Sequence, residues 1–281
     1  MTKIVTITSV CLALMLTACS KEQTTQPIQA DTDNTTKQSQ TLRIAAAANL
    51  SDVLPEIIAG YKMDKNLPAQ EIEVSYASSG KLYAQITSGA PYDIFLSANQ
   101  EFPAKLAKEK LDNANSADEA THKPFTYTQG QLALYSVNKS LDGLNAASLN
   151  ALLMNESDSK ITIANPELAP YGKSAQAYLQ AQNIFDTLTE QNRIIQAENI
   201  GQAFQYAHTG NVDYGFVAQS QLTAIKATPE QFYTLAPESY PAILQDGIVL
   251  NNNTAATDFS NYLRSPAGQQ YFSKAGYLAV N

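Results

Sequence analysis

Residues 71–86, with the sequence EIEVSYASSGKLYAQI, decide the fold because they combine a strand pattern with a helix pattern. Polar and apolar residues alternate over 71–76, which is typical of a half-buried strand. Residues 77–80 (ASSG) break this alternation, and the apolar residues from 82 to 86 then follow at helical spacing. The segment therefore predicts a junction where two serines and a glycine lie between the end of a strand and the beginning of a helix.

This predicted junction has the chemistry of an anion site. The first backbone N–H groups of a helix have no intrahelical partner, and the helix dipole places about half a positive charge there. Gly80 would let a ligand approach the main chain closely, and the hydroxyls of Ser78 and Ser79 are additional donors. A serine that only caps its helix would give the same local pattern, so this motif alone leaves both interpretations open.

A second junction of this kind opens the folded part of the chain. Residues 42–48 (LRIAAAA) read as a buried strand, and a helix is predicted from Asn49 to about Met63. Asn49 is a favourable N-cap residue, and Asp52 three residues later resembles the second half of a capping box. The small alanine side chains before the turn leave room for a ligand against the main chain, which makes Asn49 a candidate neutral donor.

Two more junctions follow in the second half of the chain. A strand is predicted at 160–164 and a helix at 173–182, which places Tyr171 and its phenolic donor between them. A short strand is predicted at 194–196, and a helix is predicted from residue 198 to about residue 209.

The order of the predicted elements indicates an α/β fold. Strands and helices alternate from residue 42 onward, which is typical of mostly parallel sheets flanked by helices. Ligands of open α/β sheets bind beyond the carboxyl ends of the strands, and all four junctions lie at such ends. Because two junctions come from each half of the chain, the sequence predicts two lobes with a ligand cleft between them.

Composition and charge argue against several functional classes. The 281 residues are 44% hydrophobic, and the net charge of −8 argues against non-specific binding to nucleic acid. The sequence has no phosphate-loop or dinucleotide-binding glycine motif and no histidine or cysteine cluster with metal-ligand spacing. The only histidines, His122 and His208, are far apart in sequence, so a serine hydrolase is a remote alternative.

The N-terminal 41 residues are predicted to target the protein and to tether it to a membrane. An apolar stretch over 4–16 is too short to span a bilayer as a stable helix, which is typical of a signal peptide. The following LTAC resembles the lipobox of bacterial lipoproteins, in which the cysteine is acylated and becomes the mature N-terminus. Residues 1–19 are therefore predicted to be a lipoprotein signal peptide with lipidation at Cys19, and the polar residues 20–41 are predicted to be a flexible tether.

Six motifs, in order, resemble those of the periplasmic molybdate-binding proteins of bacterial molybdate ABC importers. The motifs lie at 45–50 (AAAANL), 76–82 (YASSGKL), 89–98 (GAPYDIFLSA), 165–172 (NPELAPYG), 198–204 (ENIGQAF) and 210–217 (GNVDYGFV). This resemblance implies a type II periplasmic binding protein fold, in which two crossover strands join lobe 1 (residues 42–128 and 239–281) to lobe 2 (residues 129–238). It also implies a monomeric, non-enzymatic protein of the periplasm or cell envelope, without a cofactor, whose partner is an ABC permease in the inner membrane.

The same resemblance assigns ligand residues by position. Ser79 is the second serine of the family's serine pair, and Asn49 falls where the better-known members have a serine. Ile200 matches a valine whose backbone N–H binds the oxyanion. Ala48 is expected to contribute a backbone contact at most.

One tyrosine donor lies at a different position from that of the better-known members. Ala218 falls where those members have a donating tyrosine, whereas Tyr171 falls where they have an alanine. The exchange resembles a second subgroup of the family and keeps the number of donors the same. The resemblance therefore implies Asn49, Ser79, Tyr171 and Ile200 as ligand-binding residues, with the phenol of Tyr171 at the edge of the cleft.

The chemistry of these donors agrees with an oxyanion ligand. Molybdate is a fully deprotonated tetrahedral dianion at neutral pH, so its site needs donors and no acceptor, and no side chain need coordinate the molybdenum directly. Tungstate is nearly the same size, and sulfate would use the same donors in a smaller cavity. Phosphate would need an acceptor for its remaining proton, for which Asp52 is the only nearby candidate. Sulfate, phosphate or a small organic acid therefore remain alternative ligands.

Overall fold

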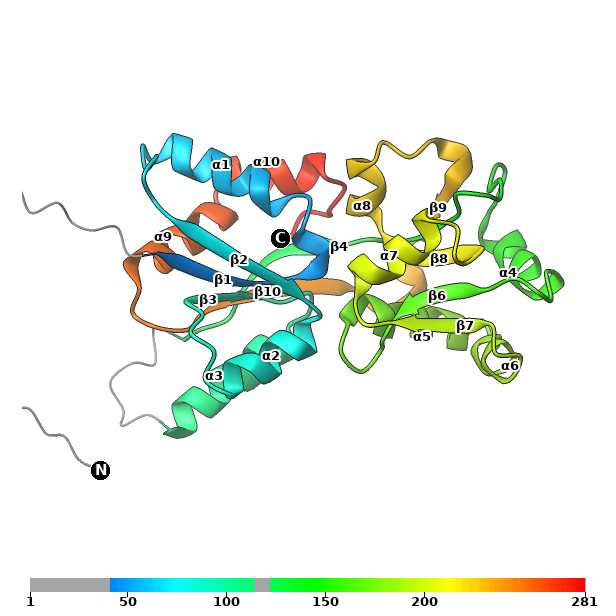
Figure 1. Cartoon of the computed structure of the whole chain (residues 1–281), viewed down its shortest axis with the longest axis horizontal. Coiled ribbons are helices and arrows are strands. Elements are labelled where there is room, and N and C mark those ends of the chain that lie inside the picture. The colour runs from blue at the N-terminus through cyan, green and yellow to red at the C-terminus, as the bar shows by residue number, and fades with distance from the viewer. Residues whose placement is uncertain (1–40, 114–121, 281) are drawn as a thin grey trace, which may run out of the picture. The chain divides into compact units, whose positions relative to one another are not determined.

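The computed structural model describes residues 41–113 and 122–280, and these residues form two five-stranded sheets flanked by helices (Figure 1). The strand order is β2-β1-β3-β10-β4 in the first sheet and β7-β6-β8-β5-β9 in the second. The chain passes between the sheets twice, from β4 to β5 and from β9 to β10. The predicted two-lobed α/β fold is therefore confirmed, while Cys19 and the rest of the N-terminal segment up to residue 40 lie outside the described residues.

In each sheet, one strand runs against the direction of the other four. These reversed strands, β10 and β5, are each antiparallel to both of their neighbours. Each of them directly follows a crossover, so the reversal occurs where the chain changes lobes. The first sheet contains β1 (Leu42–Ala47), β2 (Ile72–Ala77), β3 (Ile94–Leu96), β4 (Phe125–Gly130) and β10 (Ile243–Val249), and the second contains β5 (Leu132–Tyr135), β6 (Ile161–Ala164), β7 (Ile194–Ala197), β8 (Tyr214–Ala218) and β9 (Phe232–Thr234).

Helices cover both faces of each sheet because successive strand residues point to opposite faces. Leu42 and Ile44 of β1 pack with α1, α9 and α10, whereas Ala45, whose side chain points to the opposite face, packs with α2 and α3. Figure 1 shows these two groups of helices on the two sides of the first sheet. On the second sheet, α4, α5 and α6 share one apolar cluster, and α7 and α8 contribute to the other. The helices are α1 (Leu54–Asp64), α2 (Ser79–Thr87), α3 (Glu101–Asn113), α4 (Ala146–Asn155), α5 (Pro170–Ala181), α6 (Phe185–Glu190), α7 (Ile200–His208), α8 (Gln219–Ala224), α9 (Thr254–Arg264) and α10 (Pro266–Lys274), with 3₁₀ turns η1 (Ala48–Leu50), η2 (Pro229–Gln231) and η3 (Pro237–Ser239).

The register of the parallel strands brings the four junctions together in pairs. Ala47 at the end of β1 pairs with Ala77 at the end of β2, so the turns that carry Asn49 and Ser79 leave the first sheet side by side. In the second sheet, the last residues of β6 and β7 are paired in the same way, which makes the segments leading to α5 and α7 neighbours.

Two helix starts differ from the sequence prediction. Asn49 lies in η1 with its side chain buried and caps no helix, and Asp52 is exposed, so the predicted capping box is wrong. The α1 helix begins only at residue 54, where Pro55 occupies a first-turn position that suits its fixed φ angle. For the same reason α5 begins at Pro170, and Tyr171 therefore lies in the first turn of that helix instead of the loop before it.

Candidate functional site

The four junctions lie where the two lobes contact each other. The backbone N–H of Gly80 in α2 donates to the carbonyl oxygen of Leu168 before α5, with an N···O distance of 2.9 Å. Glycine suits this approach, since a Cβ on Gly80 would lie only 3.0 Å from the Cα of Leu168. The η1 turn packs against the beginning of α7, where a Cβ on Gly201 would lie 3.7 Å from the Cβ of Ala48. Helix starts from both lobes therefore face one small region.

The two serines at the beginning of α2 are buried, and neither uses its side chain to cap the helix. Ser79 Oγ accepts a hydrogen bond from the backbone N–H of Ala98 at 2.9 Å, which leaves its own proton free to donate. Ser78 Oγ has no hydrogen-bond partner in the described part of the chain. The alternative that these serines only cap α2 is therefore wrong, and their hydroxyls are available as donors.

Asn49 is fully buried and held by side chains from distant parts of the sequence. Its Nδ2 lies 3.0 Å from both Gln245 Oε1 and Tyr277 Oη, and it donates to these oxygens. Tyr277 Oη donates in return to the backbone carbonyl of Asn49 at 2.7 Å. Asn49 Oδ1 has no partner among the described residues. The side chain of Asn49 is thus fixed by β10 and by the C-terminal tail.

Tyr171 is buried, so its expected position at the edge of the cleft is wrong: the side chain is only 1% exposed. The phenolic oxygen lies over Gly130 at the end of β4, where a Cβ would be 2.1 Å from it. Gln245 Nε2 donates to this oxygen at 3.2 Å. Because Gly130 lacks a side chain, the ring of Tyr171 can enter the region between the lobes.

Ile200 is the first residue of α7, so its backbone N–H has no intrahelical partner. Asn199 caps the helix by accepting from the backbone N–H of Gln202 at 3.0 Å. At the position of the missing family tyrosine, the backbone N–H of Ala218 donates to Gln221 Oε1 at 3.0 Å. Gln221 Nε2 then donates to the carbonyl of Ile200 at 3.1 Å, which connects β8 to the beginning of α7.

The phenols around the site are neutral donors at physiological pH. Burial raises the pKa of Tyr171 well above its ordinary value, and the neighbouring phenol of Tyr277 raises it further. Burial raises the pKa of Tyr127 and Tyr277 in the same direction. Lys81 and Glu198 form an ion pair of 2.6 Å across the lobes, and their side chains are about half exposed. The charge of Asp246 adds to the rise in the pKa of Tyr127, and that of Asp52 adds to the rise in the pKa of Tyr277. Carboxylates therefore lie near the supporting phenols, whereas the proposed donor groups themselves are uncharged.

A cavity of about 340 Å³ opens between α3 and the loop before α5. Glu101 and Lys105 form an ion pair of 2.7 Å within its wall, and Lys173 approaches Glu101 from the other lobe at 3.5 Å. None of the predicted ligand residues lines this cavity.

The arrangement of the histidines does not favour a serine hydrolase. His208 Nδ1 lies 2.9 Å from Tyr135 Oη, and His122 Nδ1 lies 3.0 Å from the carbonyl of Val249. Within residues 41–113 and 122–280, neither imidazole has a serine partner, no three acidic, histidine or cysteine side chains group as a metal site, and no helix is long and apolar enough to cross a membrane.

Sequence reasoning missed two side chains that organise the site, Gln245 and Tyr277. Gln245 lies within the mostly apolar segment 242–250 (AILQDGIVL), where Asp246 is the only other polar side chain, and a glutamine inside such a strand pattern is the signal that could have identified it. Tyr277 belongs to the C-terminal tail, in which Leu278 forms an antiparallel bridge with Gln129. No local pattern indicates that the Tyr277 hydroxyl reaches Asn49.

Comparison with known proteins places these features in a family. A sequence profile described as "Bacterial extracellular solute-binding protein" matches residues 42–278. The chain is 30% identical over 244 residues to the molybdate-binding protein ModA of Azotobacter vinelandii, covering 85% of this chain and 90% of that protein. It is 31% identical over 265 residues to ModA of Rhodobacter capsulatus (86% and 99% coverage) and 29% identical over 269 residues to the putative ABC transporter substrate-binding lipoprotein YvgL of Bacillus subtilis (95% and 94%).

Solved structures give the same comparison in three dimensions. The periplasmic molybdate-binding protein of Azotobacter vinelandii superimposes with a TM-score of 0.74 at 28% identity, covering 85% of this chain and all of that chain. The sulfate-binding protein SubI of Mycobacterium tuberculosis H37Rv superimposes with a TM-score of 0.62 at 15% identity, covering 86% of this chain and 87% of that chain. The second likeness shows the shared fold alone.

Proposed function

Because the chain belongs to the family of bacterial extracellular solute-binding proteins, we propose that it captures molybdate or tungstate for an ABC importer. The oxyanion binds between the lobes to donors from Asn49, Ser79, Tyr171 and the backbone N–H of Ile200, with at most a backbone contact from Ala48. The protein acts as a monomer and delivers the ion to a permease in the inner membrane.

The observation that carries this proposal is the burial of several uncharged donors with unused hydrogen-bonding capacity at one place. Ser79 keeps its hydroxyl proton free, Tyr171 accepts from Gln245 and keeps its own proton, and Ile200 begins a helix. A dianion that loses its water needs such donors, and each bond to a charged group is worth about 1.5–3 kcal/mol. Relatives named as molybdate-binding proteins support this choice among oxyanions.

Sulfate, phosphate and a small organic acid are the competing ligands for the same fold. Phosphate needs an acceptor for its remaining proton, and Asp52, the candidate from the sequence, has an exposed side chain. The buried Asn49 Oδ1, which has no partner among the described residues, is a second candidate acceptor, so the affinity for phosphate must be measured as well. Sulfate is separated from molybdate only by size, so a direct comparison of affinities is required.

Calorimetric titration of the full-length protein with molybdate, tungstate, sulfate and phosphate tests the ligand. We expect molybdate and tungstate to bind at least a hundredfold more tightly than the other two anions. Tighter binding of sulfate or phosphate, or no binding of any oxyanion, would overturn the proposed function.

A site divided between two lobes is complete only when the lobes meet, so we propose that the ligand favours the closed state. Small-angle X-ray scattering with and without saturating molybdate tests this. A smaller radius of gyration is expected in the presence of the ion, and an unchanged radius would contradict ligand-driven closure.

We also propose that the protein works in the periplasm or cell envelope and is anchored to a membrane by lipid on Cys19. The relative named as a putative substrate-binding lipoprotein supports this proposal, although Cys19 lies outside the described residues. Cys19→Ala should leave molybdate affinity unchanged and release the protein from the membrane fraction. Continued fractionation with membranes after a salt wash would contradict the anchor.

A further inference from the structure

Gln245 connects the proposed donors of the two lobes through one buried amide. Its Oε1 accepts from Asn49 Nδ2 at 3.0 Å, and its Nε2 donates to Tyr171 Oη at 3.2 Å. Its side chain is fully buried, on the crossover strand β10. The ladder between β10 and β4 shifts register between Gln245 and Asp246, and such bulges re-aim side chains.

The surrounding hydroxyls determine which way the Asn49 amide points. Tyr277 has one phenolic proton, and it donates that proton to the backbone carbonyl of Asn49 at 2.7 Å. Its oxygen can therefore only accept from the Asn49 side chain, which requires Nδ2 to face it at 3.0 Å. The same Nδ2 faces Gln245, so the atom of Gln245 that meets it is the acceptor Oε1. Tyr127 Oη lies 3.1 Å from this Oε1 and 2.9 Å from the carbonyl oxygen of Ser97, so its hydroxyl proton is shared between two acceptors.

The orientation of Gln245 in turn determines what Tyr171 can do. With Oε1 facing Asn49, the Nε2 group faces Tyr171 and occupies a lone pair of the phenolic oxygen. The proton of Tyr171 is then left for another acceptor, and none is present for it among the described residues. If the Gln245 amide were turned by 180°, its Oε1 would accept the Tyr171 proton. Its Nε2 would then face Asn49 Nδ2, so two donors would meet without an acceptor.

We propose that Gln245 is a positioning residue that sets the polarity of the oxyanion site, keeping Tyr171 as a donor to the ligand and fixing Asn49 as a support for the η1 turn. This inference rests on the proposed function. It makes the availability of the Tyr171 proton depend on a residue that need not touch the ligand. It also assigns the contribution of Asn49 to its backbone, since its Nδ2 is occupied by Gln245 and Tyr277.

The experiment is a double-mutant cycle that measures molybdate affinity by calorimetry on the full-length protein. Tyr171→Phe is compared in three backgrounds: the unchanged protein, Gln245→Glu and Gln245→Met. In the unchanged protein, we expect loss of the phenol to weaken binding by at least tenfold. In Gln245→Glu, the carboxylate accepts the phenolic proton, so Tyr171→Phe should weaken binding by less than threefold.

Gln245→Met removes both the donor and the acceptor at similar volume, so it preserves the test if the glutamate variant does not fold. Tyr171→Phe should again cost less than threefold there, because the phenol is no longer oriented. A side chain that only fills space would leave the cost of Tyr171→Phe equal in all three backgrounds, and that result would overturn the role of Gln245. Absence of molybdate binding to the unchanged protein would instead overturn the proposed function, and this inference with it.

Discussion

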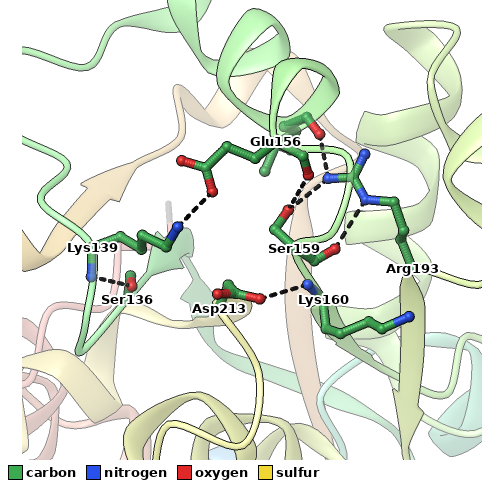
Figure 2. Close-up of polar contacts among 8 residues, drawn as sticks. Ser136, Lys139, Glu156, Ser159, Lys160, Arg193 and Asp213 are labelled. Atoms are coloured by element: carbon green, nitrogen blue, oxygen red, sulfur yellow. Dashed lines mark hydrogen bonds and ion pairs between the residues drawn. The ribbon is translucent and has the colours of Figure 1, made fainter.

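The two ends of the second sheet differ in the kind of polar group that they carry. At the carboxyl ends of its strands, the proposed site collects uncharged hydroxyl, amide and backbone donors. At the opposite end, beside the amino ends of β6, β7 and β8, charged side chains gather (Figure 2). Lys139 pairs with Glu156 at 3.0 Å, and Asp213 accepts from the backbone N–H of Lys160 at 2.7 Å.

Arg193 is the buried member of this charged cluster, with only 1% of its surface exposed. It donates to the carbonyl oxygens of Leu153 and Ser159 at 2.5 and 2.9 Å and to Ser159 Oγ at 2.6 Å (Figure 2). Leu153 lies in the last turn of α4, where free carbonyls and the helix dipole favour a cation. Among the described residues, no carboxylate lies within ion-pair distance of Arg193.

The comparison of Arg193 with the uncharged donors of the proposed site indicates where a permanent charge can be buried. The hydrogen-bond partners of Arg193 are Leu153, Ser159 and Gln191, which belong to the same lobe, so the compensation of its charge does not depend on a bound ligand. A cation in the proposed cleft would lose its compensation whenever the ligand left, and a buried unpaired charge is expensive. Neutral donors avoid this cost because the ligand itself brings the charge.

The largest effect is expected from Arg193→Met. This change leaves buried carbonyls without donors, and each such group costs about 1–3 kcal/mol, so the free energy of unfolding should fall by about 2–5 kcal/mol. Molybdate affinity should change less than twofold, since the residue lies at the far end of the sheet. Urea unfolding and calorimetry measure the two quantities. Lys139→Met, which removes a partly exposed ion pair from the same cluster, is the control and should change both quantities much less.

Ser79→Ala should do the reverse, with a large effect on binding and a smaller one on stability. It removes a donor to a buried dianion, worth about 1.5–3 kcal/mol, so affinity should fall by about tenfold to a hundredfold. Ser78→Ala is the matched control one residue away, and we expect it to weaken binding less. Calorimetric titration of molybdate into both variants compares the two losses of affinity. A larger loss for Ser78→Ala would show that Ser78, and not Ser79, donates to the ligand.

The buried phenols predict how stability depends on pH. Burial raises the pKa of Tyr171 and Tyr127 in the folded state. In the unfolded state, a tyrosine has its ordinary pKa of about 10, so above that pH the unfolded chain releases phenolic protons that the folded state keeps. The stabilisation is therefore complete below pH 10 and decreases above it, by up to about 1.4 kcal/mol per pH unit for each phenol. Urea unfolding between pH 8 and about pH 11 measures this dependence. Tyr171→Phe should flatten the curve, whereas an unchanged slope would contradict burial of this phenol.

The smallest effect is expected from Lys81→Ala. Lys81 carries a charge next to Gly80, but its ion pair with Glu198 is half exposed, and such pairs are worth about 0.2–1 kcal/mol. Molybdate affinity should fall by less than threefold, and the difference should disappear at high salt. A loss as large as that of Ser79→Ala would show that the charge of Lys81, and not the neutral donors, holds the anion.

Local sequence patterns predicted the alternating order of strands and helices, but they missed three of the elements. The strand that became β4, and the helices α6 and α8, were not predicted, and the last two contain only six residues each. Periodicity carries little information over so few residues. The predicted boundaries of the two lobes, at 128/129 and 238/239, remain predictions.

The sequence by itself determined that strand-to-helix junctions fall near Asn49, Ser79, Tyr171 and Ile200, since periodicity and helix-start chemistry are local. Only the tertiary structure decided what the side chains do there. Gln245 reaches Asn49 across 196 positions of the sequence and Tyr171 across 74, and the turn at Asn49 became a 3₁₀ segment instead of a cap. The polarity of a hydrogen-bond network depends on every partner at once, and those partners are brought together only when both lobes fold.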